Sequence, residues 1–126
     1  MKTGIKAVIK KDNKYLLLHK SLTVPRFPDF WDFPGGGLDD DENPTEGIKR
    51  EVLEETSLKI EPIKVIWKTQ AEVNGNMVEY KVYSVKLLSE EIKLSHEHTE
   101  FKWLTKEELL KLKVEPYIKL FFKEKI

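Results

Sequence analysis

The chain has no cysteine among its 126 residues, which excludes a disulfide scaffold, a thiolate metal site and a thiol nucleophile. Histidine is scarce as well, and His19 lies too far along the sequence from His96 and His98 for a three-histidine metal site to be expected. No apolar run approaches the roughly 20 residues of a membrane helix, and the start, MKTGIKAVIKK, is too charged for a signal peptide. We therefore expect a cytoplasmic protein with no membrane partner.

An excess of charge of either sign is also missing, because 22 Lys and Arg residues balance 22 Asp and Glu residues. A neutral chain has no overall attraction to nucleic acid or to an anionic membrane, so no DNA partner is expected. The chain does have enough apolar material for a core, with 40% hydrophobic and 10% aromatic residues. Chains of this length usually fold as one unit, so residues 1–126 are predicted to form a single domain.

Strands are predicted on both sides of one helix. Alternating apolar residues in 4–11 and 15–20, around the turn residues 11–14, predict a hairpin, and Asn74-Gly75-Asn76 predicts a second one. The predicted strands outside the first hairpin are 30–33, 61–73, 77–88 and 99–104, and the predicted helices are 44–56, 105–112 and 116–123. This order predicts an α+β or α/β sandwich and not a βαβ repeat.

The predicted helix 44–56 carries three glutamates close together. At about 100° per residue, Glu51, Glu54 and Glu55 share an arc of about 100° directly beside the apolar stripe of the helix. Like charges one turn apart repel, and the repulsion costs more near a buried edge. Either these acids point into water, or a cation lies among them. Hard oxygen ligands on one helix face suit Mg²⁺ or Mn²⁺.

The alternative is that these glutamates form the solvated face of an ordinary surface helix. Two features favour the metal site. The acids adjoin the apolar stripe instead of opposing it, and a run of three glycines with a further acid, Glu42, lies just upstream. Three consecutive glycines allow a backbone to turn sharply or to approach a ligand closely.

The segment 35–60 resembles the Nudix box, G-x5-E-x7-R-E-U-x-E-E-x-G-U, where U is an aliphatic residue. The spacing is intact, and the matching positions are Gly36, Glu42, Arg50, Glu51, Val52, Glu54, Glu55 and Leu58. The preceding WDFPGG is similar to the strand that leads into the box in MutT-like members. Ser57 replaces the box glycine, where a left-handed helix end would cost about 1 kcal/mol of strain, unless the helix ends differently.

The resemblance implies the Nudix fold, an α/β/α sandwich with a mixed central sheet, one catalytic helix and a C-terminal helix. It implies hydrolysis of a nucleoside diphosphate linked to another group, with Mg²⁺ or Mn²⁺ as cofactor. A small nucleotide, foremost a nucleoside triphosphate as in MutT-like pyrophosphohydrolases, is the implied substrate. The alternatives are a nucleotide-sugar, ADP-ribose or RNA 5′ pyrophosphohydrolase, and a nucleotide-binding module without catalysis.

The resemblance also assigns roles to residues. The implied metal ligands are Gly35, through a backbone carbonyl in the Gly35–Gly36 turn, and the helix acids Glu51, Glu54 and Glu55. The attacking water is deprotonated by one of these acids, with Glu51 and Glu54 as candidates, or by a loop acid. Glu97 occupies that loop position, with Glu100 as its rival and an ordinary acidic loop as the alternative.

Three further residues are expected to support the site without touching substrate: Gly36, Glu42 and Arg50. The angular position of Arg50 on the helix, about 100° per residue, predicts that it points away from the metal-binding acids. We expect Arg50 to pair with Glu42 and to lock the glycine loop onto the helix.

Candidate substrate-binding residues are fewer. Lys20 follows the second strand and is expected to hold substrate phosphates, whereas Arg26 is expected to be a solvated surface charge. Trp31 is a candidate for stacking on the base, as are Phe30 and Tyr80, although we expect at least two of these three aromatic residues to belong to the core.

Three other positions bear on specificity and assembly. His96 and His98 flank Glu97 and either polarise a phosphate or face solvent as loop residues, and we expect the second. Val114 stands where MutT-type enzymes carry the asparagine that reads oxidised guanine, which argues against an 8-oxo-dGTP substrate. The pair Phe121-Phe122 is either a homodimer contact or a core anchor.

Overall fold

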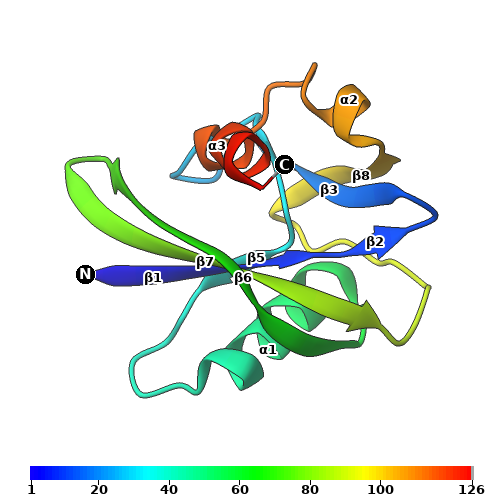
Figure 1. Ribbon diagram of the computed structural model, residues 1–126, viewed down its shortest axis with the longest axis horizontal. Helices are drawn as coiled ribbons and strands as arrows, with labels where there is room; N and C mark the ends of the chain where they lie inside the picture. Colours follow the sequence, from blue (N-terminus) through cyan, green and yellow to red (C-terminus); the bar gives the residue numbers. More distant parts are fainter. Residues whose placement is uncertain (126) are drawn as a thin grey trace.

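The computed structural model describes residues 1–125, which form two small β-sheets with helices on both sides (Figure 1). The strands are β1 (Lys2–Val8), β2 (Lys10–Lys11), β3 (Lys14–Lys20), β4 (Trp31–Asp32), β5 (Gly35–Gly37), β6 (Ile60–Val73), β7 (Asn76–Leu87) and β8 (His98–Leu104). The helices are α1 (Pro44–Thr56), α2 (Lys106–Leu109) and α3 (Pro116–Glu124). Within residues 1–125, no helix has both the length and the apolar composition needed to cross a membrane.

The first sheet is mixed and has the order β5-β1-β7-β6. Strand β1 pairs in parallel with β7 and antiparallel with β5, and β6 and β7 form the predicted second hairpin. Its turn residues Asn74 and Gly75 both have positive φ, as a tight two-residue hairpin turn requires. The second sheet is antiparallel, with β3 between β4 and β8 and with β2 at one end of β3.

The first predicted hairpin is wrong in its main part. Only Lys10–Lys11 pairs with β3, whereas the preceding residues form β1 and belong to the other sheet. The physical reason is that β1 is an interior strand, paired on both edges by β5 and β7, so it has no free edge for β3. Its residues Gly4–Val8 are buried, as expected for a strand covered on both faces.

Helix α1 begins and ends where local signals predict. The Asn43 Oδ1 atom accepts hydrogen bonds from the backbone N–H groups of Thr45 (2.9 Å) and Glu46 (3.4 Å), which is an N-cap. Ser57 adopts the left-handed conformation with φ 65°, and its N–H donates to the Leu53 carbonyl. The strained helix end expected for a serine in place of glycine is therefore present.

The other two helices differ in how well they were predicted. Helix α2 is only four residues long, shorter than the predicted 105–112, although the Thr105–Glu108 capping box is present. Helix α3 matches its prediction. Phe121 and Phe122 on α3 are both buried, so of the two interpretations of this pair the structure supports the core anchor, and the homodimer stays a prediction.

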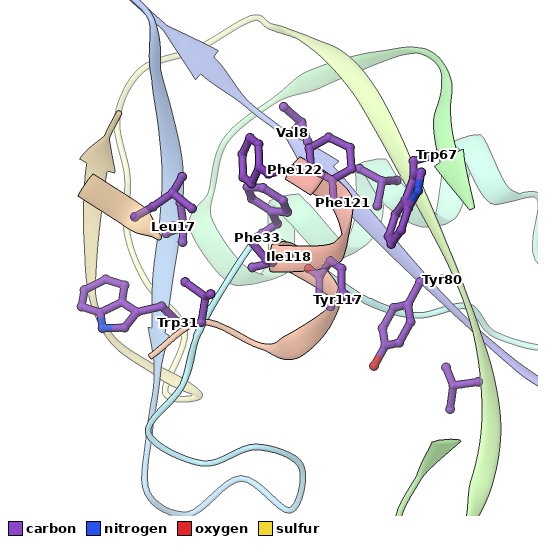
Figure 2. Close-up of a cluster of buried hydrophobic side chains, with 14 of the residues drawn as sticks. Val8, Leu17, Trp31, Phe33, Trp67, Tyr80, Tyr117, Ile118, Phe121 and Phe122 are labelled. Atoms are coloured by element: carbon purple, nitrogen blue, oxygen red, sulfur yellow. The ribbon is translucent and has the colours of Figure 1, made fainter. Parts of the chain in front are cut away.

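The two helices α1 and α3 cover opposite faces of the sheets, and each face has its own hydrophobic cluster. One cluster gathers aromatic residues under α3, where Phe33 lies against Phe121 and Phe122 (Figure 2). The other cluster packs Ile48 and Val52 of α1 against β1, β3 and β7. This arrangement is the predicted α/β/α sandwich, and it places the β5 glycines and α1 side by side.

Candidate active site

A cavity of about 840 Å³ lies beside β5 and α1, and most of the predicted site residues line it. Its wall includes Gly35 and Gly36 of β5, the acids Glu42 and Glu55, and Glu97 in the loop before β8. The same wall includes four charged residues, which we call the buried cluster. Three of them come from the strands β1, β3 and β4 and the fourth directly precedes α3: Lys6, Lys20, Asp32 and Glu115. The size of the cavity suits a small-molecule ligand.

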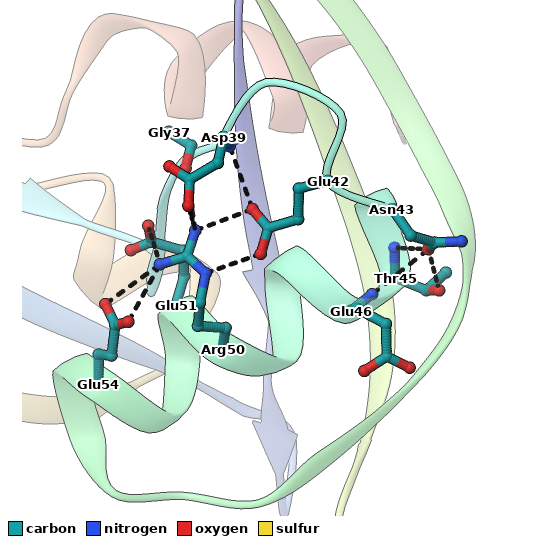
Figure 3. Close-up of polar contacts among 9 residues, drawn as sticks. All are labelled: Gly37, Asp39, Glu42, Asn43, Thr45, Glu46, Arg50, Glu51 and Glu54. Atoms are coloured by element: carbon teal, nitrogen blue, oxygen red, sulfur yellow. Dashed lines mark hydrogen bonds and ion pairs between the residues drawn. The ribbon is translucent and has the colours of Figure 1, made fainter.

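A second charged group, which we call the Arg50 cluster, consists of the guanidinium of Arg50 and the carboxylates around it (Figure 3). Arg50 Nε and Nη2 donate to the two carboxylate oxygens of Glu42 at 2.7 and 2.9 Å. Its Nη1 lies 3.1 Å from Oε1 of Glu54 and 3.1 Å from Oε1 of Glu51. The cluster also includes Asp39, at 3.4 Å from Nη2.

The predicted pair between Arg50 and Glu42 is thus present, and it ties the loop after the glycines to α1. The prediction that Arg50 points away from the helix acids is wrong. A guanidinium has five donors in a planar fork, so one side chain contacts Glu42 with one edge and Glu51 and Glu54 with the other. The hydrogen bonds from Arg50 lower the pKa of Glu42 to about 2, so this carboxylate is ionised at neutral pH.

The glycines of β5 allow a close approach between the strand and the acids of α1. A side chain at Gly36 would collide with the carboxylate of Glu51, and one at Gly35 (φ 141°) would collide with the carbonyl of Ile5. The Gly35 N–H donates to Oε1 of Glu55 at 2.8 Å. Gly35 and Gly36 are therefore the positions where the backbone of β5 meets the carboxylates of α1.

The three helix acids differ sharply in their surroundings. Glu54 is exposed at the surface, Glu51 is half-buried, and Glu55 is buried with only 7% of its surface exposed. Burial raises the pKa of Glu51, and it raises the pKa of Glu55 to about 8 against the opposing effects of Lys6 and the Gly35 N–H. A buried carboxyl group with a raised pKa becomes a good ligand when a cation is nearby, since the cation favours its ionised form.

These residues fit a hard divalent cation in their chemistry. The donors are carboxylate oxygens and backbone carbonyls, which Mg²⁺ and Mn²⁺ prefer. Within residues 1–125, however, no group of three or more His, Cys, Asp or Glu side chains converges on one point as metal ligands. Glu51 and Glu54 instead contact Arg50, and Glu55 contacts Gly35. To share an ion with Glu55, they would have to turn away from Arg50.

The loop before β8 and the first residue of β8 each contribute one side chain to the cavity. Glu97 lines it, and its backbone carbonyl accepts a hydrogen bond from Ser21 N–H at 2.9 Å. Its rival Glu100 lies in β8, outside the cavity lining. His98 also lines the cavity, and its Nδ1 is buried without a hydrogen-bond partner in residues 1–125. Burial lowers the pKa of His98 to about 4, so the ring is neutral; the expectation that it faces solvent is wrong, whereas His96 is exposed.

The buried cluster is made of two ion pairs. Lys6 Nζ lies 2.6 Å from Asp32 Oδ2, and Lys20 Nζ lies 2.7 Å from Glu115 Oε2. The Tyr117 hydroxyl donates to the other oxygen of Asp32. Burial opposes ionisation of Lys6 and Asp32, but their mutual attraction raises the pKa of Lys6 and lowers that of Asp32. Burial and the charge of Asp32 raise the pKa of Glu115 to about 7.

Of the buried cluster, the sequence patterns above indicate only Lys20 and not the other three members. Two signals were available: Lys6 is the one charged residue in GIKAVI, and Asp32 interrupts the aromatic run FWDF. Charges inside apolar strands are rarely buried without a partner, so either residue could have indicated a buried site.

The remaining candidates for substrate binding include residues that line the cavity and residues that belong to the core. Trp31 is buried, stacks on His19 with ring centroids 4.8 Å apart and does not line the cavity, so the structure places it in the core. Tyr80 is also mostly buried, in line with the expectation of two core residues among the three, although its edge lines the cavity. Arg26 is half-buried and lines the cavity as well, so its expected place as a solvated charge stays a prediction.

Comparisons with known proteins agree with this geometry. The family model of the NUDIX domain matches residues 2–124. The chain is similar to the CTP pyrophosphohydrolase of Escherichia coli K12, with 26% identity over 112 residues, 89% of this chain and 82% of that protein. It is similar to the asymmetrical bis(5′-nucleosyl)-tetraphosphatase of Mus musculus, with 33% identity over 112 residues, 82% of this chain and 74% of that protein.

Among solved structures, the MutT protein from Methanosarcina mazei Go1 has a TM-score of 0.90 and 30% identity, covering 97% of this chain and 90% of that one. This likeness confirms the predicted fold over nearly the whole chain. The family match extends far beyond the box itself, to both ends of the sandwich. The chain therefore belongs to the NUDIX family of hydrolases.

Proposed function

We propose that this chain hydrolyses the pyrophosphate bond of a nucleoside triphosphate, with Mg²⁺ or Mn²⁺ as cofactor. The observation that carries the proposal is the wall of one cavity, which combines a glycine turn, a buried carboxyl group of the box helix and a loop carboxylate. The curated relatives support a nucleotide substrate, since their names describe a CTP pyrophosphohydrolase and a dinucleoside tetraphosphatase.

The residues that would hold the metal are Glu51, Glu54, Glu55 and the backbone carbonyl of Gly35. When bound there, a divalent ion neutralises phosphate charge and lowers the pKa of a water molecule. To bind the ion, Glu54 must give up its ion pair with Arg50. This pair lies at the surface, where such pairs contribute little energy, so its loss costs little.

The chain's own residues then divide the remaining work. Glu97, or Glu51 or Glu54 at the helix, accepts the proton of the attacking water. Arg50 keeps Glu42 and the loop after β5 attached to α1, which keeps the glycine turn at the acids. Arg26 brings positive charge to the cavity, where it attracts the phosphates of a nucleotide. Lys20 lines the same cavity, and it can bind a phosphate only while it also holds Glu115 or after it leaves that carboxylate.

The experiment is a phosphate- and pyrophosphate-release screen with Mg²⁺ over nucleoside triphosphates, dinucleoside tetraphosphates, nucleotide sugars and ADP-ribose. We expect hydrolysis of nucleoside triphosphates, and a loss of at least about 100-fold in turnover for Glu54→Gln and for Glu55→Gln, because both would lose metal charge stabilisation. The matched control is Glu46→Gln, an exposed acid in the first turn of the same helix that does not line the cavity.

Two results would contradict the proposal. One is the absence of hydrolysis across the whole panel with Mg²⁺ and with Mn²⁺. The other is wild-type turnover in both helix variants, which would show that these carboxylates do not serve the reaction.

A further inference from the structure

A second pocket is separate from the candidate active site. It has a volume of about 390 Å³ and, within residues 1–125, shares no lining residue with the larger cavity. Strands of both sheets, α2 and the C-terminal end of α3 contribute to its wall. We call it the lysine pocket, because three lysines line it: Lys10, Lys106 and Lys125. Nucleotide hydrolysis at the helix acids does not account for this pocket.

The apolar part of the lysine pocket is formed by side chains of the core. Val8, Phe121 and Phe122 line it and are all buried (Figure 2). The ring of Tyr15 meets that of Phe122 edge to face, with the ring centroids 5.2 Å apart and the ring planes at 85°. The rings of Phe121 and Phe122 lie at 74° to each other. Rings at such steep angles form no flat platform for a nucleobase, whereas a flexible alkyl chain can follow their edges and faces.

Two of the lysines hold their ammonium groups over this aromatic surface. Lys10 Nζ lies 5.0 Å from the ring centroid of Tyr15, and Lys106 Nζ lies 5.9 Å from that of Phe122. Both distances are within the range of cation–π attraction, which keeps the two side chains at the pocket. Because the rings of Tyr15 and Phe122 are neighbours, two positive charges lie over adjoining rings. One anion between them would neutralise both charges.

The positive charge at the lysine pocket has no counter-charge in the described part of the chain. The ion pairs formed by residues 1–125 include neither Lys10 nor Lys106, and no acidic side chain among these residues lines the pocket. In the buried cluster, by contrast, Lys6 and Lys20 each pair with a carboxylate. The lysine pocket is therefore complementary to an anion that no residue from 1 to 125 supplies.

We propose that the lysine pocket binds a small amphiphilic anion, in which a short alkyl chain carries a carboxylate or phosphate head group. The head group lies between the ammonium groups of Lys10 and Lys106, and the chain covers Val8, Phe121 and Phe122. Charge-assisted hydrogen bonds hold the head group, and burial of the chain adds affinity. Ten residues line the pocket, which suits a small molecule and is fewer than the roughly 20–30 residues on each side of a specific protein interface.

The test is a titration of the wild-type protein, followed through its backbone amide signals in NMR spectra, with four probes that share an octyl-length chain. Octanoate and octyl phosphate carry the two anionic head groups, octan-1-ol is neutral and octyltrimethylammonium is cationic. We expect an anion to bind at least about tenfold more tightly than octan-1-ol, because it gains charge-assisted contacts, and the tighter of the two anions identifies the head group. The signal changes should lie at Lys10, Ser84 and Lys106, which line the pocket.

Two results would overturn the inference. One is that neither anion binds more tightly than octan-1-ol, or that octyltrimethylammonium binds as tightly as the anions. The other is that the signal changes gather at Gly35 and Gly36 of the larger cavity and not at the lysine pocket.

A double variant assigns the preference to the two lysines. In Lys10→Gln with Lys106→Gln both side chains stay polar but lose their charge, so we expect the affinity of the preferred anion to fall to within about threefold of that of octan-1-ol. The matched control is Lys68→Gln with Lys119→Gln, two exposed lysines of β6 and α3 that line neither the larger cavity nor the lysine pocket. A folded double variant with the wild-type preference would overturn the inference, and the wild-type comparison stands even if the variant fails to fold. Neither result bears on nucleotide hydrolysis, because Lys10 and Lys106 do not line the larger cavity.

Discussion

The Arg50 cluster and the buried cluster solve the same electrostatic problem in opposite ways. In the first, one guanidinium serves Glu42, Glu51 and Glu54 at once, and Glu54 keeps 58% of its side chain exposed. In the second, each carboxylate has its own lysine, and Lys20, the most exposed of the four side chains, is only 13% exposed. The contact of the exposed Glu54 is easily exchanged, whereas the one-to-one buried pairs are fixed in place. Glu42 and Glu51, with 17% and 15% of their side chains exposed, lie between these extremes.

This difference bears on the proposed function. If Glu54 is to turn toward a metal ion, its contact must cost little to break, and Arg50 provides such a contact near solvent. The buried pairs stay where they are, because each charge has a dedicated partner away from solvent. The repulsion between neighbouring glutamates on α1, which the sequence suggested only a bound cation or solvent would relieve, is already reduced by Arg50 of the same helix.

The largest effect on stability is expected in the buried cluster, when one partner of an ion pair is removed. Asp32→Ala leaves the Lys6 ammonium buried without its partner and removes the acceptor of Tyr117. We expect a loss of about 3–5 kcal/mol in the free energy of unfolding, measured by urea denaturation. The double variant Lys6→Met with Asp32→Leu should recover most of that loss, because it removes both charges together. A loss below about 1 kcal/mol in Asp32→Ala would mean that the pair is not truly desolvated.

Patterns of residues close together in the sequence predicted the structure well, whereas contacts between distant segments were not predicted. Helix α1 was predicted in full because its signals are local: Asn43 caps it, Pro44 begins it and the acids repeat at helical spacing. Strand β1 was assigned to the wrong partner because alternation shows that a strand exists but not which sheet it joins. Its pairing is decided by β5 and β7, far along the chain.

The candidate site shows the same difference between local patterns and distant contacts. The box residues form a short, continuous pattern, and the structure brings Gly35, Gly36 and Glu55 together as that pattern implies. The partners in the buried cluster are separated by 26 residues for Lys6 and Asp32 and by 95 for Lys20 and Glu115. A single sequence can mark Lys6 or Asp32 as a charge within an apolar strand, but it holds no local sign of which distant charge each one meets, so the pairing became visible only in the folded chain.

A smaller effect on stability is expected when a change of pH alters the charge of Glu115 in the buried cluster. Because burial raises the pKa of Glu115 from 4.5 to about 7, the folded protein binds this proton more tightly than the unfolded chain. The resulting stability is fully present below pH 4.5 and is lost as the pH rises toward and through 7. At about 1.4 kcal/mol for each tenfold change in proton affinity, the loss is about 3 kcal/mol.

Glu115→Gln removes this titration. We therefore expect the wild type to lose about 3 kcal/mol relative to Glu115→Gln between pH 4.5 and pH 8, measured by urea unfolding at a series of pH values. Glu72→Gln, measured in parallel, controls for the loss of one surface carboxylate. Parallel stability curves for the wild type and Glu115→Gln would show that Glu115 is not buried with Asp32 as the structure has it.

The smallest effect on stability is expected in the Arg50 cluster. Glu54→Ala removes an exposed pair one helical turn from Arg50, while Glu42 and Glu51 still hold the guanidinium. We expect a change of at most about 0.5 kcal/mol in the free energy of unfolding, since exposed pairs at this spacing contribute only that much. The same variant should lose most of its hydrolytic activity, so stability and function separate at this residue. A loss above about 2 kcal/mol would show that the Arg50 cluster is as rigid a part of the fold as the buried cluster, and that its acids are not free to turn toward a metal ion.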